Sequence, residues 1–103
     1  NVVLRRGEEL PTVQVIIATV VVDLANGTII AGPELTGIRF DDEDSRTLIE
    51  GAENELRNYL ERQLRRGGMS YGYLVGKVKD IVARYVYQKA KLRPMILPVV
   101  TEL

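Results

Sequence analysis

The sequence predicts an α+β domain of two layers, in which a three-stranded sheet is covered by two helices. The segment from Val13 to Leu24 is rich in β-branched residues, which favour a strand because branching at Cβ restricts the side-chain rotamers. Asn26-Gly27 then separates it from a second apolar run, and this is the strongest short-range signal for a hairpin. Two segments with helical spacing and an apolar stretch after Pro94 complete the order strand, strand, helix, helix, strand.

Size and composition limit the function classes. The 103 residues suffice for one domain with a core of its own. The chain has no cysteine, which excludes a disulfide scaffold, and no histidine, which removes both the commonest general base and the commonest transition-metal ligand. Formal net charge is zero, but acidic residues gather in the middle of the chain and basic residues near its end. We therefore expect a dipolar surface and no catalytic centre.

The first strand of the predicted hairpin carries apolar residues on both of its faces. Such a strand is covered on both sides, or is covered by helices on one side and meets another chain on the other. In a two-residue hairpin turn both Asn26 and Gly27 would take positive φ angles. We expect Gly32-Pro33 to end the second strand, and we leave residues 34–40 open between a further short strand and a loop.

The first helix begins in the acidic cluster at residues 41–45, where Asp44 or Ser45 can serve as N-cap and Thr47 with Glu50 has capping-box spacing. It ends at Gly67-Gly68. Apolar residues recur at intervals of three and four and predict one buried stripe. These residues are Leu48, Ile49, Ala52, Leu56, Leu60 and Leu64.

The second helix begins after Ser70, which we expect to be its N-cap, and it must end before Pro94. The stretch from Met95 to Leu103 is the closing strand. Pro98 has no N–H to donate to a ladder, so this strand is expected at an edge or at a bulge. We therefore place the Val13–Leu24 strand in the centre, between its hairpin partner and the last strand.

The second helix also carries the candidate binding surface. At about 100° per residue, one face of this helix, opposite the core stripe, combines cations and aromatic rings. Its residues, with Arg93 just beyond the helix, are Tyr73, Lys77, Asp80, Arg84, Tyr87 and Lys91. Three interpretations stay open: contact with RNA phosphates and bases, a subunit contact, or a solvated surface with an Asp80–Arg84 ion pair. The acidic residues of the first helix favour a subunit contact over RNA.

The sequence shows no motif typical of catalysis, of phosphate binding or of metal binding. We find no nucleophile–base pair, no phosphate-binding glycine loop and no cluster of metal-ligand residues. The run Asp41-Asp42-Glu43-Asp44 could hold a hard cation such as Mg²⁺, but a solvated helix N-terminus explains it better. We predict no catalytic residue, no metal site and no cofactor in this chain.

The end of the chain resembles a known family. The stretch YVYQKAKLRPMILPVV at residues 85–100 resembles the C-terminal end of the RNase J ribonucleases, in which an aromatic-rich helix leads through Lys and Arg into a Pro-Met-Ile-Leu-Pro strand. Shorter stretches are similar too: AGPEL at residues 31–35, LIEGA at 48–52 and NVVLR at 1–5. The resemblance thus extends over nearly the whole chain.

What the resemblance implies is the C-terminal domain alone, with residues 1–12 as the linker from an absent catalytic core and residues 13–103 as the domain. RNase J enzymes process and degrade RNA with a metallo-β-lactamase domain and an inserted β-CASP domain, and a histidine-rich motif holds zinc or another divalent metal. By resemblance, this chain is a non-catalytic domain that supports oligomer assembly and full activity of the parent enzyme. The alternative is an accessory module that contacts RNA and helps bring substrate to the catalytic core.

The expected partners follow from the sheet and from the resemblance. Because two helices can cover only one sheet face, we predict self-association into a dimer or a larger homo-oligomer through the other face, or through the edge near Val99-Val100. RNA would be reached through the parent enzyme. The uncharged run from Pro11 to Val22 is too short for a membrane span, and we expect a cytoplasmic protein.

Overall fold

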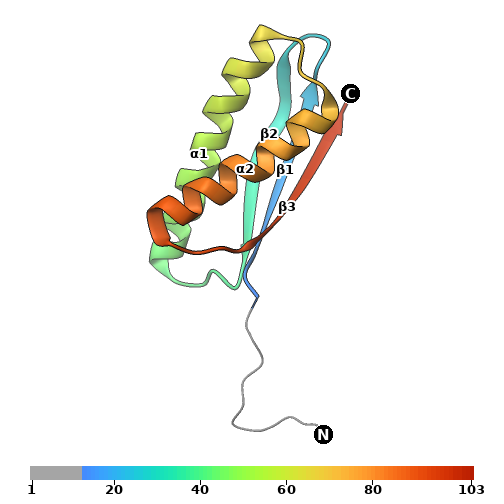
Figure 1. Ribbon diagram of the computed structural model, residues 1–103. Coiled ribbons are helices and arrows are strands. Elements are labelled where there is room, and N and C mark those ends of the chain that lie inside the picture. The colour runs from blue at the N-terminus through green and yellow to red at the C-terminus, as the bar shows by residue number, and fades with distance from the viewer. Residues whose placement is uncertain (1–12) are drawn as a thin grey trace, which may run out of the picture.

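A computed structural model describes residues 13–103 of the chain, so the predicted linker at residues 1–12 lies outside the described residues. Five elements follow one another: β1 (Val15–Asp23), β2 (Thr28–Ile38), α1 (Glu43–Arg66), α2 (Tyr71–Ala90) and β3 (Met95–Glu102). The strands form one mixed sheet in the order β2-β1-β3, with β2 antiparallel and β3 parallel to β1. Both helices lie on the same side of this sheet (Figure 1). The predicted α+β fold is confirmed, with the first strand in the centre.

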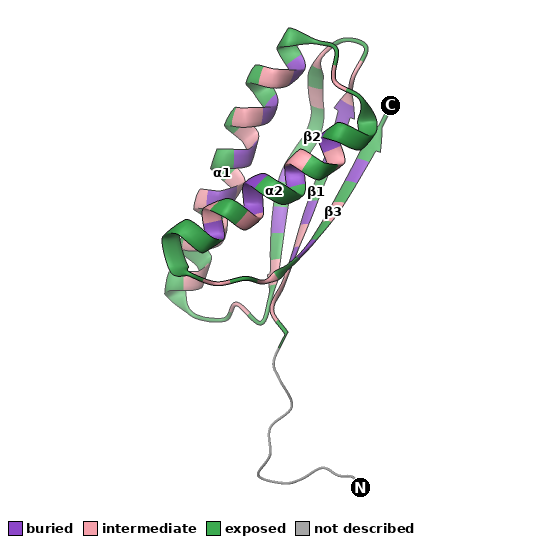
Figure 2. Cartoon of the chain, in the orientation of Figure 1, coloured by how far each residue is buried: buried purple, intermediate pink, exposed green. Residues whose placement is uncertain are grey.

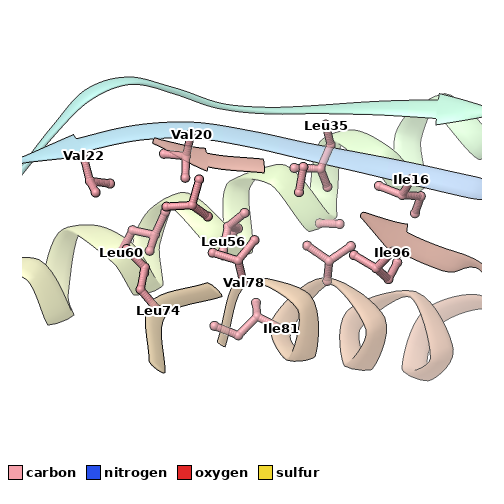
Figure 3. Packing of buried hydrophobic residues seen from close by; sticks show 14 of the residues in the cluster. Ile16, Val20, Val22, Leu35, Leu56, Leu60, Leu74, Val78, Ile81 and Ile96 are labelled. Atoms are coloured by element: carbon pink, nitrogen blue, oxygen red, sulfur yellow. The ribbon is translucent and has the colours of Figure 1, made fainter. Parts of the chain in front are cut away.

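The core lies between the two helices and one face of the sheet (Figure 3). Alternate residues of β1 point into it, namely Ile16, Ala18, Val20 and Val22, and each of them is almost completely buried. The predicted stripe of α1 packs against them through its buried members, and the helix surfaces turned away from the sheet are mostly exposed (Figure 2). The residues that recur at every second position of the strand and at every third or fourth position of the helices therefore pack together in one core.

The hairpin turn differs from the expected two-residue turn. Four residues connect the strands, and only Gly27 among them has a positive φ, at 70°, so the prediction for Asn26 was wrong. Asp23 explains the difference, because its carboxylate accepts hydrogen bonds from the backbone N–H of Asn26 at 3.0 Å and from its side-chain amide at 2.7 Å. The Gly27 N–H then donates to the Asp23 carbonyl at 2.8 Å and closes the turn.

The second strand does not end at Gly32-Pro33, contrary to the sequence prediction, and it includes most of the ambiguous segment up to Ile38. The pairing of β1 with β2 shifts in register between Thr19 and Val21, and this irregularity accommodates Gly32, which has φ 80° and precedes a cis peptide bond. A Cβ atom at Gly32 would lie 2.8 Å from the Thr19 carbonyl oxygen, so a side chain has no room there.

Helix termini confirm some of the predicted caps and correct others. The N-cap of α1 is Asp42, whose carboxylate accepts from the Ser45 N–H at 2.7 Å, and not Asp44 or Ser45. Thr47 lies inside the helix, so the capping box predicted with Glu50 does not form. Ser70 does cap α2, as predicted, by accepting from the Tyr73 N–H at 3.2 Å. Within residues 13–103, neither helix has the length and apolar character that crossing a membrane requires.

Candidate interaction surfaces

The predicted binding face of α2 divides into two parts in the structure. Tyr73, Lys77 and Arg84 lie on the side of the helix that is next to α1, where Tyr73 and Arg84 remain exposed. Tyr87 lies at the C-terminal end of α2 and contacts the residues that lead into β3. The described residues contain no ion pair between Asp80 and Arg84. The candidate residues therefore make up two separate surfaces.

The first part is joined to α1 by aromatic contacts. The Lys77 ammonium nitrogen lies 5.5 Å from the centre of the Tyr59 ring, within cation–π distance, and the Lys77 side chain is half-buried as a result. Partial burial raises the pKa of the Tyr59 hydroxyl, and the neighbouring Tyr73 raises it further, while the positive charge of Arg62 opposes the shift. Tyr59 thus lies at the centre of a mixed group of cations and rings.

A groove of about 260 Å³ continues this surface between the two helices. Its lining residues come from both helices and are Glu55, Tyr59, Arg62, Ile81, Arg84, Tyr85 and Gln88. The sequence argument took α2 by itself and so missed Tyr59 and Arg62. Only the packing of the two helices shows that Arg62 and Arg84 belong to one groove.

The second part of the face is already occupied by contacts within the chain. The ring of Tyr87 has the Arg93 guanidinium 4.3 Å from its centre and the Lys91 ammonium nitrogen 5.1 Å away. Lys91 also caps the helix in a left-handed conformation, with φ 60°, and its N–H donates to the Tyr87 carbonyl at 2.8 Å. These contacts order the connection from α2 to β3 and place two cations against the ring of Tyr87.

The sheet face turned away from the helices is left uncovered within the described part of the chain, and it is apolar. On β3 it exposes Met95, Leu97 and Val99, which keep 54%, 43% and 46% of their surface accessible. Val15 and Ile17 lie beside them on β1 because they pair with Met95 and Leu97 in the parallel ladder. This face continues onto β2, where Ile38 pairs with Val15. We call it the open sheet face.

The free edge of β2 is covered by α1. Along β2 the backbone N–H and C=O groups point alternately towards β1 and away from it. Thr36 and Glu34 pair with Ile17 and Thr19 and point towards β1, so Leu35 and Pro33 point their backbone groups outwards. The outward Leu35 N–H donates to Glu53 Oε1 at 2.9 Å, and the outward Pro33 carbonyl accepts from Arg57 at 3.3 Å. Glu53 and Arg57 also form an ion pair at 3.2 Å. An i, i+4 pair of helix side chains thus blocks this edge against another strand.

The free edge of β3 is blocked in a different way. The Met95 N–H donates to Gln14 and the Leu103 N–H donates to Val22, so alternate residues from 95 to 103 bind β1 and those between them face outwards. Pro98 is one of the outward residues and has no N–H, as its predicted edge position requires. Val100 is another, and the Tyr71 hydroxyl donates to its carbonyl at 2.8 Å.

The acidic start of α1 is a helix cap in this structure. Hydrogen bonds from the Ser45 hydroxyl and from its N–H hold the pKa of Asp42 below the usual 3.8. Within residues 13–103 no three Asp or Glu residues are placed to hold a metal ion together. A groove of about 440 Å³ lies beside this cap, but Asp42 and Asp44 share its lining with Lys89. Its charges are therefore mixed, and they single out no class of ligand.

Comparison with known proteins gives one consistent picture. Residues 2–103 match the family model described as the ribonuclease J C-terminal domain. Over its full length the chain is 31% identical to the protein named ribonuclease J 2 in Staphylococcus epidermidis, and equally similar to those of Staphylococcus aureus and Staphylococcus saprophyticus. The chain covers 19% of the length of each of these relatives.

Proposed function

The chain belongs to the family of ribonuclease J C-terminal domains, and from this premise we propose that it is a non-catalytic assembly domain, which joins copies of a parent ribonuclease through the open sheet face. The observation that carries the proposal is the combination, within residues 13–103, of an uncovered apolar sheet face with two blocked sheet edges. The relatives are named as ribonucleases, and the chain corresponds to about a fifth of their length. Because most of each relative lies outside the matched region, we propose, too, that the parent enzyme acts on RNA.

The apolar character of the open sheet face supports a protein partner. Three large apolar side chains of β3 are about half exposed on it, and neighbouring strands extend the same surface. Monomeric proteins rarely expose a continuous apolar patch larger than a few hundred Å², and larger ones mark interaction sites. A second copy of the same face is a suitable partner, because packing of two sheets face to face buries both apolar surfaces.

The blocked edges support the face as the contact, in preference to either edge. Of the two sequence-based alternatives, contact through the edge near Val99-Val100 would require the Val100 carbonyl, which Tyr71 already uses. At the other edge a new strand would have to displace Glu53 and Arg57 from their bonds to β2. Self-association by strand addition is therefore disfavoured at both ends of the sheet.

The residues along the open sheet face indicate where the contact is centred. Apolar partners meet at one end, where Val15 pairs with both Ile38 and Met95. Further along, Thr19 pairs with Glu34, so the face becomes polar there. We place the centre of the interface at the apolar end, because buried interface cores are depleted in charge.

Catalysis belongs to the rest of the parent enzyme in this proposal. The chain has no histidine or cysteine for a zinc site, and the carboxylates of its described part form no cluster for another divalent metal. We infer that the catalytic metal of the parent, zinc or another divalent ion, is bound outside this chain, and that this domain contributes through assembly. A cytoplasmic location of the parent, where RNA is processed and degraded, fits this proposal.

The experiment is a charge placed on the open sheet face. Leu97→Glu should shift the chain from oligomer to monomer in sedimentation velocity runs over the micromolar range, because a carboxylate would be buried in the contact. Asn58→Glu, on the exposed side of α1, adds the same charge and should leave the sedimentation coefficient unchanged. Thermal unfolding of both variants checks that the fold survives.

Two results would overturn this assignment. One is a wild-type chain that stays monomeric throughout the micromolar range. The other is an oligomer that persists in Leu97→Glu but dissociates in Tyr87→Ala, which would move the subunit contact to the face of α2 predicted from the sequence.

A further inference from the structure

We propose that the groove between α1 and α2 is a binding site for single-stranded RNA, in which Arg62 and Arg84 hold a phosphate and the neighbouring tyrosines stack on a base. This site is separate from the open sheet face, because the helices that form it cover the opposite side of the sheet (Figure 1). The proposal goes beyond assembly and does not depend on it.

Charge is the first argument. Arg62 from α1 and Arg84 from α2 are both exposed and line the same groove, and neither forms an ion pair with any carboxylate in residues 13–103. Lys77 adds a third cation beside Tyr59. The acidic groups on this side are Glu55, which lines the groove, and Asp80 on α2. Two guanidinium groups without a carboxylate partner in the described part of the chain therefore favour a ligand that is an anion.

Ring surfaces next to these cations are the second argument. Tyr59 and Tyr85 line the groove, and Tyr73 lies beside Tyr59. Aromatic rings that alternate with cations are typical of proteins that bind single-stranded nucleic acid, since the rings stack on bases while the cations contact phosphates. Gln88 completes the lining with an amide that can donate to and accept from a base edge.

An acidic peptide is the competing ligand, because it also offers anionic groups. Its carboxylates would use the two guanidinium groups but would not stack on the adjacent tyrosine rings. A nucleotide uses both kinds of group at once. The composition of the groove therefore favours RNA over an acidic protein segment.

The test uses the 103-residue chain and a short, fluorescein-labelled, single-stranded oligouridylate, with binding followed by fluorescence anisotropy at several salt concentrations. The double variant Arg62→Gln/Arg84→Gln should bind more weakly and reduce the slope of log K against log salt by about 0.7, the share of the one phosphate that the two arginines hold. The matched control is Arg65→Gln/Arg66→Gln, which removes the same charge from the last turn of α1 and should keep both affinity and slope.

Stacking has its own pair of variants. Tyr59→Leu should weaken binding by about 5- to 150-fold through loss of the ring, and Tyr59→Phe should retain most of the affinity. The oligomeric state of each variant should match that of the unmodified chain, which separates this proposal from the assembly role.

Several outcomes would each overturn the site. These are no binding of the oligouridylate by the unmodified chain, equal weakening in the two double-arginine variants, or an unchanged salt slope in Arg62→Gln/Arg84→Gln. Competition by a short polyglutamate as effective as that of unlabelled RNA would instead assign the groove to an acidic protein partner.

Discussion

Removal of the Glu53 side chain is the most direct test of how the edge of the sheet is stabilised. One carboxylate oxygen of Glu53 accepts from the Leu35 N–H at 2.9 Å, and the other pairs with Arg57 at 3.2 Å. In Glu53→Ala the Leu35 N–H loses its partner at a partly buried position, and Arg57 loses its counter-charge.

The expected cost follows from these two contacts. A hydrogen bond to a charged acceptor contributes about 1.5–3 kcal/mol, and a surface ion pair at i, i+4 adds about 0.3–0.5 kcal/mol. The Glu53 side chain keeps 27% of its surface exposed, so water can replace part of the lost bond and the lower end of this range applies. We expect Glu53→Ala to lose about 2 kcal/mol of unfolding free energy. For a domain of this size this corresponds to a melting temperature lower by about 8–16 °C.

Urea denaturation measures this loss as a lower midpoint with an unchanged slope. Two variants serve as controls. Glu50→Ala removes an exposed carboxylate of the same helix and should stay within about 0.5 kcal/mol of the unmodified chain. Glu53→Gln keeps an acceptor oxygen for Leu35 and should lose only about half as much as Glu53→Ala. The reasoning fails if Glu53→Ala is as stable as Glu50→Ala, or if Glu53→Gln is as unstable as Glu53→Ala.

Three further predictions concern the helices. Gly51→Ala should cost about 1–2 kcal/mol in thermal unfolding, because its Cβ would overlap both the Tyr85 hydroxyl and the ring carbon that carries it; a variant as stable as the unmodified chain would contradict this. Gly76→Ala should instead stabilise α2 by about 0.5–1 kcal/mol, since nothing lies within 4 Å of the new Cβ; a loss of stability would show that this glycine has another role. Hydrogen bonds from the Ser45 hydroxyl and N–H lower the pKa of Asp42, so the cap stabilises the fold above pH 3.8, and this stabilisation is lost as the pH falls through the lowered pKa. The difference in unfolding free energy between the unmodified chain and Asp42→Ala, measured in urea, should therefore shrink over that acidic range. A difference that stays constant would contradict this.

Much of the fold could be read from the sequence because it depends on short-range patterns. The spacing of Leu56, Leu60 and Leu64 repeats the helical period, and all three are buried. Ser70 and Pro98 act through their own backbone neighbourhood, so the helix start and the edge position that they predicted are both found. The family resemblance, carried by residues 85–100, is confirmed by the match over residues 2–103.

Local rules failed where a distant contact decided the outcome. Gly32-Pro33 was expected to stop a strand, yet β2 continues past it, because Pro33 lies at an outward position that needs no N–H and its carbonyl is bound by Arg57. Asp23 likewise changed the turn before Gly27 through a side-chain hydrogen bond that residue preferences do not include.

The sequence by itself determined the order of the elements and the faces that they bury, since the periods of strands and helices are properties of neighbouring residues. Only the tertiary structure decided which surfaces stay available for partners. Glu53 and Tyr71 close the two sheet edges, and Arg62 joins Arg84 in one groove, through contacts between elements far apart in the chain. Such contacts depend on how the helices are set against the sheet and against each other, and the pattern within any single segment carries no information about that arrangement.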